Sequence, residues 1–399
     1  MELYEVVFAA VILGRFLVPL MIPVYPLPGI LGAFLLDASD RAIYAQFVEI
    51  DVEVYQSYDK ALDIYYLTLA YVATLRNWAN DTALRVARHL WYYRLVGVTL
   101  FEVTGIRWLL VVFPNAFEYF FVYYEVVKTR WHAERLGRTH LLVAAAVIWV
   151  FIKIPQEYWV HVAQGDTTDF IKANLVGAPL EMPWIQVFVH YPWVVGATGL
   201  LIGLLLLASA LLLRLLPAPE RPLAFHADAF VRITPATELI GRRRHPRRPP
   251  RQVLLERVAL VSLVVVIFGE VIPGWVASPF QVAASVSIVI AVNAGVSVWL
   301  GRLGVLWRGA AAEFVFMGAL NVALVLAYGR AVGRMDVDFH MGSALFLMGL
   351  LTLIVTLHDR YLSLRTLRVP EALDQDDEPP RGSPPGPSAP TWSHPRTGK

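Results

Sequence analysis

The stretch from Trp193 to Leu213, W-V-V-G-A-T-G-L-L-I-G-L-L-L-L-A-S-A-L-L-L, decides the fold of this chain. It contains 21 consecutive residues and no charged side chain. An α-helix rises about 1.5 Å per residue, so this stretch is long enough to cross the roughly 30 Å hydrocarbon core of a bilayer. No water is available there for exposed backbone groups, which must therefore bond to one another within a helix. The stretch predicts a transmembrane helix.

The composition extends this prediction to the rest of the chain. Of the 399 residues, 57% are hydrophobic and only 17% are charged, with a mean hydropathy of +0.54. Soluble domains carry about 25% charged residues, so the bilayer is the solvent to reason with. We expect an all-α polytopic integral membrane helical bundle of about ten transmembrane helices. The other nine expected spans are residues 6–25, 61–75, 83–103, 106–127, 140–162, 254–276, 280–300, 310–332 and 342–357.

A basic stretch with three prolines, Arg242 to Arg251, separates the expected spans into two sets and predicts a linker. The end of the chain is rich in Pro, Gly, Ser and acidic residues and has too few apolar side chains to fold. The predicted organisation is a six-span module at 1–216 with an acidic segment at 37–63, a basic cytoplasmic linker at 217–252, a four-span module at 253–365 and a disordered cytoplasmic tail at 366–399.

Lysine and arginine in short loops predict the orientation, because such loops stay in the cytoplasm. The basic loops alternate with uncharged ones across the second module, and the same alternation continues backwards through the first. Both termini are then expected in the cytoplasm, with residues 37–59 and 156–192 outside. Arginine greatly outnumbers lysine, which indicates a high-GC bacterial genome and hence a bacterial plasma membrane. The expected cytoplasmic segments are 76–88, 128–138, 214–251, 302–308 and 360–368.

Several function classes are excluded by composition. The absence of cysteine excludes disulfides, thiolate catalysis and sulfur-ligated metals. The net charge of +2 and the short basic clusters give no basic face for nucleic acid. The expected partners are the lipid bilayer and a lipid-linked substrate, and the sequence indicates no particular oligomeric state.

Prolines interrupt the first expected span before a short apolar run at 30–36. Pro19, Pro23, Pro26 and Pro28 remove backbone donors in close succession. We expect a broken or re-entrant helix here, lining protein or water.

Ionisable residues inside or beside spans are the candidate site, because an unpaired charge at mid-bilayer costs about 2.5 to 3.5 kcal/mol. Four aspartates follow the interrupted helix, and a stripe at helical spacing follows from Lys153. If these segments converge, their oxygens suit Mg²⁺ or Mn²⁺, whereas the alternative is a solvated acidic loop. The candidate catalytic residues are Asp37, Asp40, Asp59, Asp63, Glu157 and His161; the candidate substrate-binding residues are Arg15, Lys153 and Glu118.

One family resemblance involves the same residues. Asp37-Ala-Ser-Asp40 followed by Asp59-Lys-Ala-Leu-Asp63 resembles the four-aspartate signature of the CDP-alcohol phosphatidyltransferases, and Arg15 to Pro23 is similar to their first helix. The chain departs from that pattern at both glycines, which are Arg41 and Tyr55 here, at Tyr44 and Ala45 in place of Ala-Arg, and in a spacer one residue longer. The family's glycines let a nucleotide approach the helix backbone, and its site faces the cytoplasm. These departures disfavour that activity for this chain.

Three functions remain open. The first is an enzyme acting on a lipid or lipid-linked sugar at the outer membrane face, a layout that resembles multispan glycosyltransferases with polyprenyl-phosphate donors. The second is an ion- or proton-coupled transporter that uses Glu118, Glu270, Asn293 and Asn321. The third is a non-catalytic membrane scaffold in which every buried charge is paired.

Overall fold

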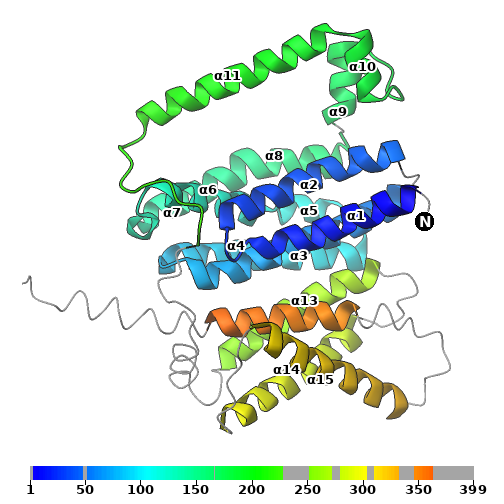
Figure 1. Ribbon diagram of the computed structural model, residues 1–399, viewed down its shortest axis with the longest axis vertical. Helices are drawn as coiled ribbons and strands as arrows, with labels where there is room; N and C mark the ends of the chain where they lie inside the picture. The colour runs from blue at the N-terminus through cyan, green and yellow to red at the C-terminus, as the bar shows by residue number, and fades with distance from the viewer. Residues whose placement is uncertain are drawn as a thin grey trace, which may run out of the picture.

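The computed structural model describes residues 3–47, 52–165, 167–227, 251–271, 279–302, 310–331 and 346–362. Every regular element in this part of the chain is helical, which confirms the all-α fold class (Figure 1). Most of the expected linker and the whole expected tail lie outside the described residues. So does the side chain of Glu270.

The first group of helices forms a bundle around α3 (Val52–Asn77), whose side chains from Ile64 to Leu75 are almost all fully buried. Its neighbours are α1, α2 and α4, and aromatic rings such as Trp78, Trp91 and Phe117 fill the interior. The other elements of this bundle are α1 (Leu3–Leu17), η1 (Val18–Met21), α2 (Pro26–Phe47), α4 (Asp81–Thr104), α5 (Trp108–Val112), α6 (Ala116–Arg130), η2 (Ala133–Arg135), α7 (Arg138–Val147), η3 (Ile148–Lys153), α8 (Ile154–Glu157) and η4 (Tyr158–Val162).

Local sequence signals explain where α4 begins and ends. The side chain of Asn80 accepts hydrogen bonds from the backbone N–H groups of Thr82 and Ala83, both at 3.0 Å, and so caps the helix. Gly105 ends it in a left-handed conformation with φ +68°, which glycine adopts without steric cost. Pro114 lies in the break between α5 and α6, so the single span expected at 106–127 is two helices placed end to end.

The prolines after α1 do not produce a short re-entrant helix. Pro26 and Pro28 lie in the first turn of α2, where a backbone N–H has no helical partner to lose. The expected break is present between α1 and α2, but the run at 30–36 is part of a continuous helix of 22 residues, so the re-entrant alternative was wrong. As a result Asp37 and Asp40 lie on a helix and not in a loop.

Residues 138–162 form one long helix from α7 to η4, with wide π-helical turns at η3 and η4 on either side of Pro155. Proline removes a backbone donor from the helical ladder, and wide turns are one way to accommodate that loss. These turns carry Lys153 and His161. Single π-turns in helices often mark functional positions.

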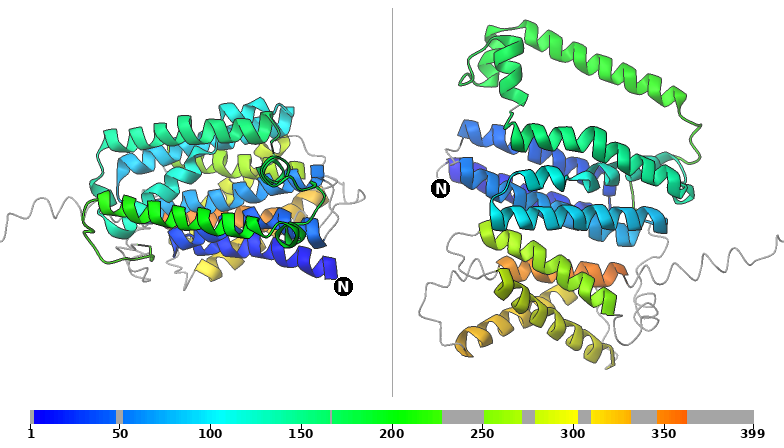
Figure 2. Two further views of the ribbon diagram at one scale, coloured as in Figure 1. Left: turned by 90° about the horizontal axis from the view of Figure 1, so that it is seen from above. Right: turned by 180° about the vertical axis from the view of Figure 1, so that it is seen from behind.

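Among the described residues, three helical stretches are long and apolar enough to cross a membrane: Trp108–Arg130, which comprises α5 and α6, Arg138–Val162 and Trp193–Leu211. The last belongs to α11 (Trp193–Leu215), which lies at one edge of the molecule with nearly all its apolar side chains exposed (Figure 2). An exposed, uncharged helix of this length fits lipid better than water. Short elements lead to it: α9 (Thr167–Phe170), η5 (Ile171–Val176) and α10 (Trp184–His190).

The carboxy-terminal helices lie at the edge opposite α11 (Figures 1 and 2). They are α13 (Arg251–Val271), α14 (Pro279–Arg302), α15 (Ala310–Ala331) and a last described helix at 346–362, which we name the C-terminal helix. The first of them, α13, packs against α3 and α4. There Glu256 accepts a hydrogen bond from the hydroxyl of Tyr71 and lies 3.3 Å from the Arg88 guanidinium.

Consecutive helices at the start of the chain run antiparallel: α2 runs opposite to α1, and α3 runs opposite to α2. The rings of Phe8 and Tyr44 are 5.7 Å apart, so the amino end of α1 lies beside the carboxyl end of α2. Arg76 contacts Pro23 at the other end of the bundle. Because α2 adds a full antiparallel helix, the amino end of α1 and Arg76 lie at opposite ends of the bundle. We expected the amino end of α1 and the 76–88 loop on the same side of the membrane. They lie instead at opposite ends of the bundle.

The first part of the expected linker packs onto the bundle as an extended segment, residues 217–227, which we name the strap. Its backbone N–H groups donate to the carbonyl oxygens of Thr129 and Arg130, the last turn of α6. Those carbonyls have no partner within their own helix, so the strap satisfies them. Trp131 in turn donates from Nε1 to the carbonyl oxygen of Pro217 at 3.2 Å.

Candidate functional site

Four aspartates surround one arginine where α1, α2 and α3 meet. Arg15, from the last turn of α1, lies 2.7 Å from Asp37, 2.6 Å from Asp59 and 2.9 Å from Asp63. It also pairs with Asp40. We name these five residues the Arg15 cage.

Helical spacing explains why the four carboxylates point the same way. Asp37 and Asp40 are three residues apart on α2, and Asp59 and Asp63 are four apart on α3, so each pair lies on one helix face. The two faces meet across Arg15. The four aspartates therefore converge on Arg15, whereas the stripe that begins at Lys153 does not join them.

The cage is closed on one side and open on the other. The side chains of Arg15 and Asp40 are 2% and 0% exposed. Those of Asp37, Asp59 and Asp63 are 33%, 27% and 29% exposed. Ligand oxygens of these last three lie within 4.8 Å of one another, close enough for one metal ion to contact all three.

The charges of the cage do not balance. Four carboxylates share one guanidinium, and like charges at this spacing repel unless a proton or a further cation joins them. Buried charge without compensation is strongly unfavourable. The arrangement therefore favours a bound cation on the open side, at the oxygens that Arg15 leaves available.

A second group of polar side chains centres on Glu118 at the start of α6. Its carboxylate accepts hydrogen bonds from the Tyr66 hydroxyl at 2.8 Å, from Asn115 Nδ2 at 2.8 Å and from Lys153 Nζ at 2.9 Å. Lys153 Nζ also lies 3.9 Å from the ring centre of Tyr119. With three charged or polar donors on one carboxylate, this group is well satisfied.

Glu157 extends this group along α8. It accepts a hydrogen bond from the backbone N–H of Asn115 at 3.0 Å and lies 3.0 Å from His161 Nε2. The guanidinium of Arg94 is 3.6 Å away. Asn115 thus joins the two glutamates: its backbone N–H donates to Glu157, and its side-chain amide donates to Glu118. We name Tyr66, Glu118, Lys153, Glu157 and His161, with Asn115 and Arg94, the Glu118 network.

The structure places the predicted site residues in these two groups and not around one cavity. Tyr66 lies one turn after Asp63 on α3, so the two groups adjoin through that helix. Arg15 and Lys153 were expected to meet a substrate phosphate. Both are buried and already paired with carboxylates, so neither presents its charge to a phosphate directly.

Tyr66 and Arg94 belong to the Glu118 network, and sequence reasoning missed the part they play in it. Tyr66 falls three residues after Asp63, and that spacing on a helix was the available signal. Arg94 contacts Glu157 and the carbonyl oxygen of Phe113, the latter at 3.1 Å.

Comparisons with protein-family models, with curated proteins and with solved structures find no match. Function is therefore inferred from the geometry of the Arg15 cage and the Glu118 network.

Proposed function

We propose that this chain is a multi-pass membrane enzyme that acts on a phosphate-bearing lipid or lipid-linked sugar with the help of a divalent cation. This proposal rests on the open side of the Arg15 cage, where the oxygens of Asp37, Asp59 and Asp63 lie within 4.8 Å of one another. Mg²⁺ and Mn²⁺ prefer oxygen ligands and are commonly held by carboxylates together with substrate phosphates.

Each cage residue has a distinct part in this proposal. Arg15 and Asp40 form the buried floor of the site, and this floor holds the other carboxylates in place. Asp37, Asp59 and Asp63 would hold the cation, and the cation would supply the positive charge that a phosphate needs to enter an acidic site.

The position of the cage supports a lipid substrate. Asp59 lies seven residues after the start of α3, about 10 Å along the helix, and Asp37 lies near the middle of α2. A site at this depth in a membrane bundle is within reach of a lipid headgroup drawn between helices. The exposed apolar surface of α1, including Leu13 and Leu17, gives such a lipid a path.

We further propose that the end of the bundle opposite the cage faces the cytoplasm. That end gathers positive charge from several elements, and the cage lies nearer the other end. A bacterial plasma membrane, about ten spans in all and an outward-facing site complete this proposal. The basic side chains at this end include Arg76, Lys128, Arg130, Arg135, Arg138 and Arg221.

Coupled transport of an ion or proton is the second candidate, and the Glu118 network favours it. A buried carboxylate with exchangeable donors from three helices is the arrangement that a proton relay needs. Transport predicts that substitutions at Glu118 abolish function while the cage tolerates neutralisation. If the chain is an enzyme, neutralisation of the cage aspartates should abolish function and substitutions at Glu118 should be tolerated.

The first experiment measures cation binding by purified full-length protein in detergent. Mg²⁺ or Mn²⁺ should raise the unfolding temperature, because a ligand at a hundredfold excess over its Kd stabilises the folded state by about 2.7 kcal/mol. Asp59→Asn and Asp63→Asn should remove that rise and leave the protein folded. Asp81→Asn, the same change at the exposed start of α4, is the matched control and should keep it.

The second experiment compares lipid extracts of cells that carry the parent, Asp63→Asn, Glu118→Gln or Asp81→Asn chains. Mass spectrometry should show one phosphate-bearing lipid accumulating with Asp63→Asn and unchanged with Asp81→Asn. An unfolding temperature indifferent to both cations, together with unchanged lipids in Asp63→Asn cells, rules the enzyme out. A defect confined to Glu118→Gln favours transport.

A further inference from the structure

Two buried charges lie near the end of α6, under the strap. Glu125 and Lys128 form an ion pair at 3.4 Å, and their side chains are only 5% and 9% exposed. Trp78 donates a hydrogen bond from Nε1 to the Glu125 carboxylate at 2.6 Å. Neither the Arg15 cage nor the Glu118 network includes this ion pair, so neither candidate function accounts for it.

A small cavity adjoins the ion pair and has room for about one water molecule. It is lined by Leu27 of α2, by Glu125, Lys128 and Thr129 of α6, and by Ala224, Phe225 and His226 of the strap. The lining residues from α2 and α6 are buried, whereas the three from the strap are exposed. The strap is therefore the outer wall of the cavity and lies between the ion pair and the outside of the molecule.

The strap is attached at the surface and not built into the core. Backbone hydrogen bonds to α6 and to Val24 fix its course. Arg221 anchors it, because Nη2 and Nε donate to the carbonyl oxygen of Trp131 at 2.7 and 3.2 Å. The apolar side chains of Leu223 and Phe225 remain 50% and 45% exposed, so the strap buries little apolar surface. A segment of this kind opens at a smaller free-energy cost than a packed helix does.

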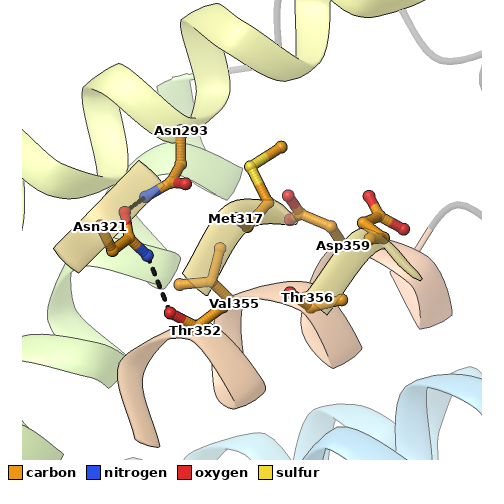
Figure 3. Close-up of a pocket in the computed structure, with 8 residues that line it drawn as sticks. Asn293, Met317, Asn321, Thr352, Val355, Thr356 and Asp359 are labelled. Carbon is orange, nitrogen blue, oxygen red and sulfur yellow. Dashed lines mark hydrogen bonds between the residues drawn. The ribbon is translucent and has the colours of Figure 1, made fainter. Parts of the chain in front are cut away.

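A second cavity of similar size has no such wall. It lies between α14, α15 and the C-terminal helix, and every residue that lines it belongs to one of these helices (Figure 3). Hydrogen bonds run across all three helices, from Asn293 to Asn321 at 2.7 Å and from Asn321 to Thr352 at 2.8 Å. Access to that cavity requires packed helices to separate. Access to the cavity beside Glu125 requires only that the strap detach.

We propose that the strap is a lid, which opens at the basic end of the bundle and lets water reach the ion pair of Glu125 and Lys128. The side chain of Arg221 holds the lid closed. Glu125 lies seven residues after Glu118, so the two carboxylates lie on one face of α6, about 10 Å apart along the helix. The open lid thus gives water access to that face from the end of the bundle opposite His161. The lid does not depend on which of the two candidate functions the chain has.

The test measures how fast a small water-soluble thiol reagent labels single cysteines in purified full-length protein in detergent. Thr129→Cys places a thiol of similar size at the cavity. Thr68→Cys is the matched control in the core of α3, where the native side chain is 0% exposed and reports only global unfolding. Thr129→Cys should react much faster than Thr68→Cys while the protein stays folded. Equal labelling rates for the two thiols overturn the lid.

A second substitution in the Thr129→Cys background tests the anchor. Arg221→Gln should increase the labelling rate about tenfold, because hydrogen bonds from a charged donor are lost. Arg138→Gln, the same change at the exposed start of α7, should leave the rate unchanged. If Thr129→Cys does not fold, Leu27→Cys reports on the same cavity from α2. A labelling rate that does not respond to Arg221→Gln, or that rises equally with Arg138→Gln, overturns the proposal.

Discussion

Arg76, in the last turn of α3, donates a hydrogen bond from Nη1 to the carbonyl oxygen of Pro23 at 3.1 Å. The turn after α1 and the end of α3 are therefore at the same end of the bundle. The strap reaches this end too, since Ala227 donates its N–H to the carbonyl oxygen of Val24 at 2.8 Å. This end carries the basic side chains that we assign to the cytoplasm.

The sidedness can be read from single cysteines, because the chain has none of its own. Gln164 is exposed beyond η4 at the end of the bundle opposite Arg76, and Ala218 is exposed in the strap. An impermeant thiol reagent added to intact cells should label Gln164→Cys and spare Ala218→Cys. Lysed cells should label both. Protection of Gln164→Cys with labelling of Ala218→Cys would invert the topology.

Removal of the cage arginine should be far more harmful than removal of a surface arginine. Arg15→Met removes the guanidinium that pairs with the fully buried Asp40, a loss of about 3 to 5 kcal/mol for a broken buried pair. Arg135→Met, at an exposed loop, should change stability by no more than about 0.5 kcal/mol. Unfolding in detergent measures both.

The double variant Arg15→Met/Asp40→Asn sharpens this prediction. It also removes the buried negative charge of Asp40 and should recover part of the stability lost in Arg15→Met. No recovery would mean that Asp40 does not depend on Arg15, contrary to the cage geometry.

The contact between α4 and the break before α6 is tight at Gly97. A Cβ at this position would lie 2.1 Å from Phe113 Cβ, a distance that no packing allows. Gly97→Ala should therefore destabilise the protein by about 1 to 3 kcal/mol or more. Gly199→Ala in α11 has nothing within 4 Å and should be neutral. Equal unfolding temperatures for the two variants would contradict the packing of α4 on Phe113.

The link between Tyr66 and Glu118 can be measured with a double-mutant cycle. A hydrogen bond to a charged group contributes about 1.5 to 3 kcal/mol, so Tyr66→Phe and Glu118→Gln should be strongly non-additive in unfolding free energy. Tyr25→Phe is the control, because this ring lies at the basic end, tilted against the His226 ring with 4.5 Å between the ring centres. Its combination with Glu118→Gln should add within about 0.5 kcal/mol.

The strap should loosen at acid pH. Burial alone raises the pKa of Glu134, but the hydrogen bond with His132 and the charge of Arg221 outweigh it, so the pKa falls below its ordinary value of 4.5. Because the pKa of Glu134 is lower in the folded state, the ionised carboxylate stabilises the folded contact at pH values above its ordinary pKa. This stabilisation is lost as the pH falls through the lowered pKa of the folded state. The exposed ion pair between Glu134 and Arg221 contributes about 1 kcal/mol at most to the stability of the folded state.

Deuterium uptake in residues 217–227, corrected for the intrinsic exchange rate, measures this loosening. In the parent, deuterium uptake should increase at pH values below the ordinary pKa of a carboxyl group. In Glu134→Gln, uptake should be increased already at neutral pH. Identical pH profiles for the two proteins would remove Glu134 from the strap contact.

The all-helical class and the cage residues were predictable from sequence for specific reasons. Uncharged runs of bilayer length such as 193–213 indicate helices, and the spacings of Asp37 with Asp40 and of Asp59 with Asp63 indicate shared faces. The full extent of α2 was not predictable from hydropathy. Its aspartates lower the local hydropathy, and only the contact with Arg15, a tertiary feature, explains how a helix tolerates them there.

Other parts of the site depend on neighbours that no local pattern reveals. Tyr66 is one of many tyrosines, and its role is set by Glu118, which lies 52 residues further along the chain. The pairing of Arg94 with Glu157 likewise depends on how α4 packs beside α8. The break at Pro114 was visible in the sequence, yet a hydropathy window that spans it reads as one continuous helix.

The Arg15 cage also constrains how the chain enters its membrane. Its basic residue is on α1, and its acidic residues are on α2 and α3, so neither of the first two helices contains both partners of a cage ion pair when it leaves the ribosome. Alone in lipid, α1 would expose a cation and α2 two carboxylates, each at a cost of a few kcal/mol. Membrane integration of the amino-terminal segment must therefore wait until Asp63 has been synthesised, with the insertion machinery holding three helices as one unit.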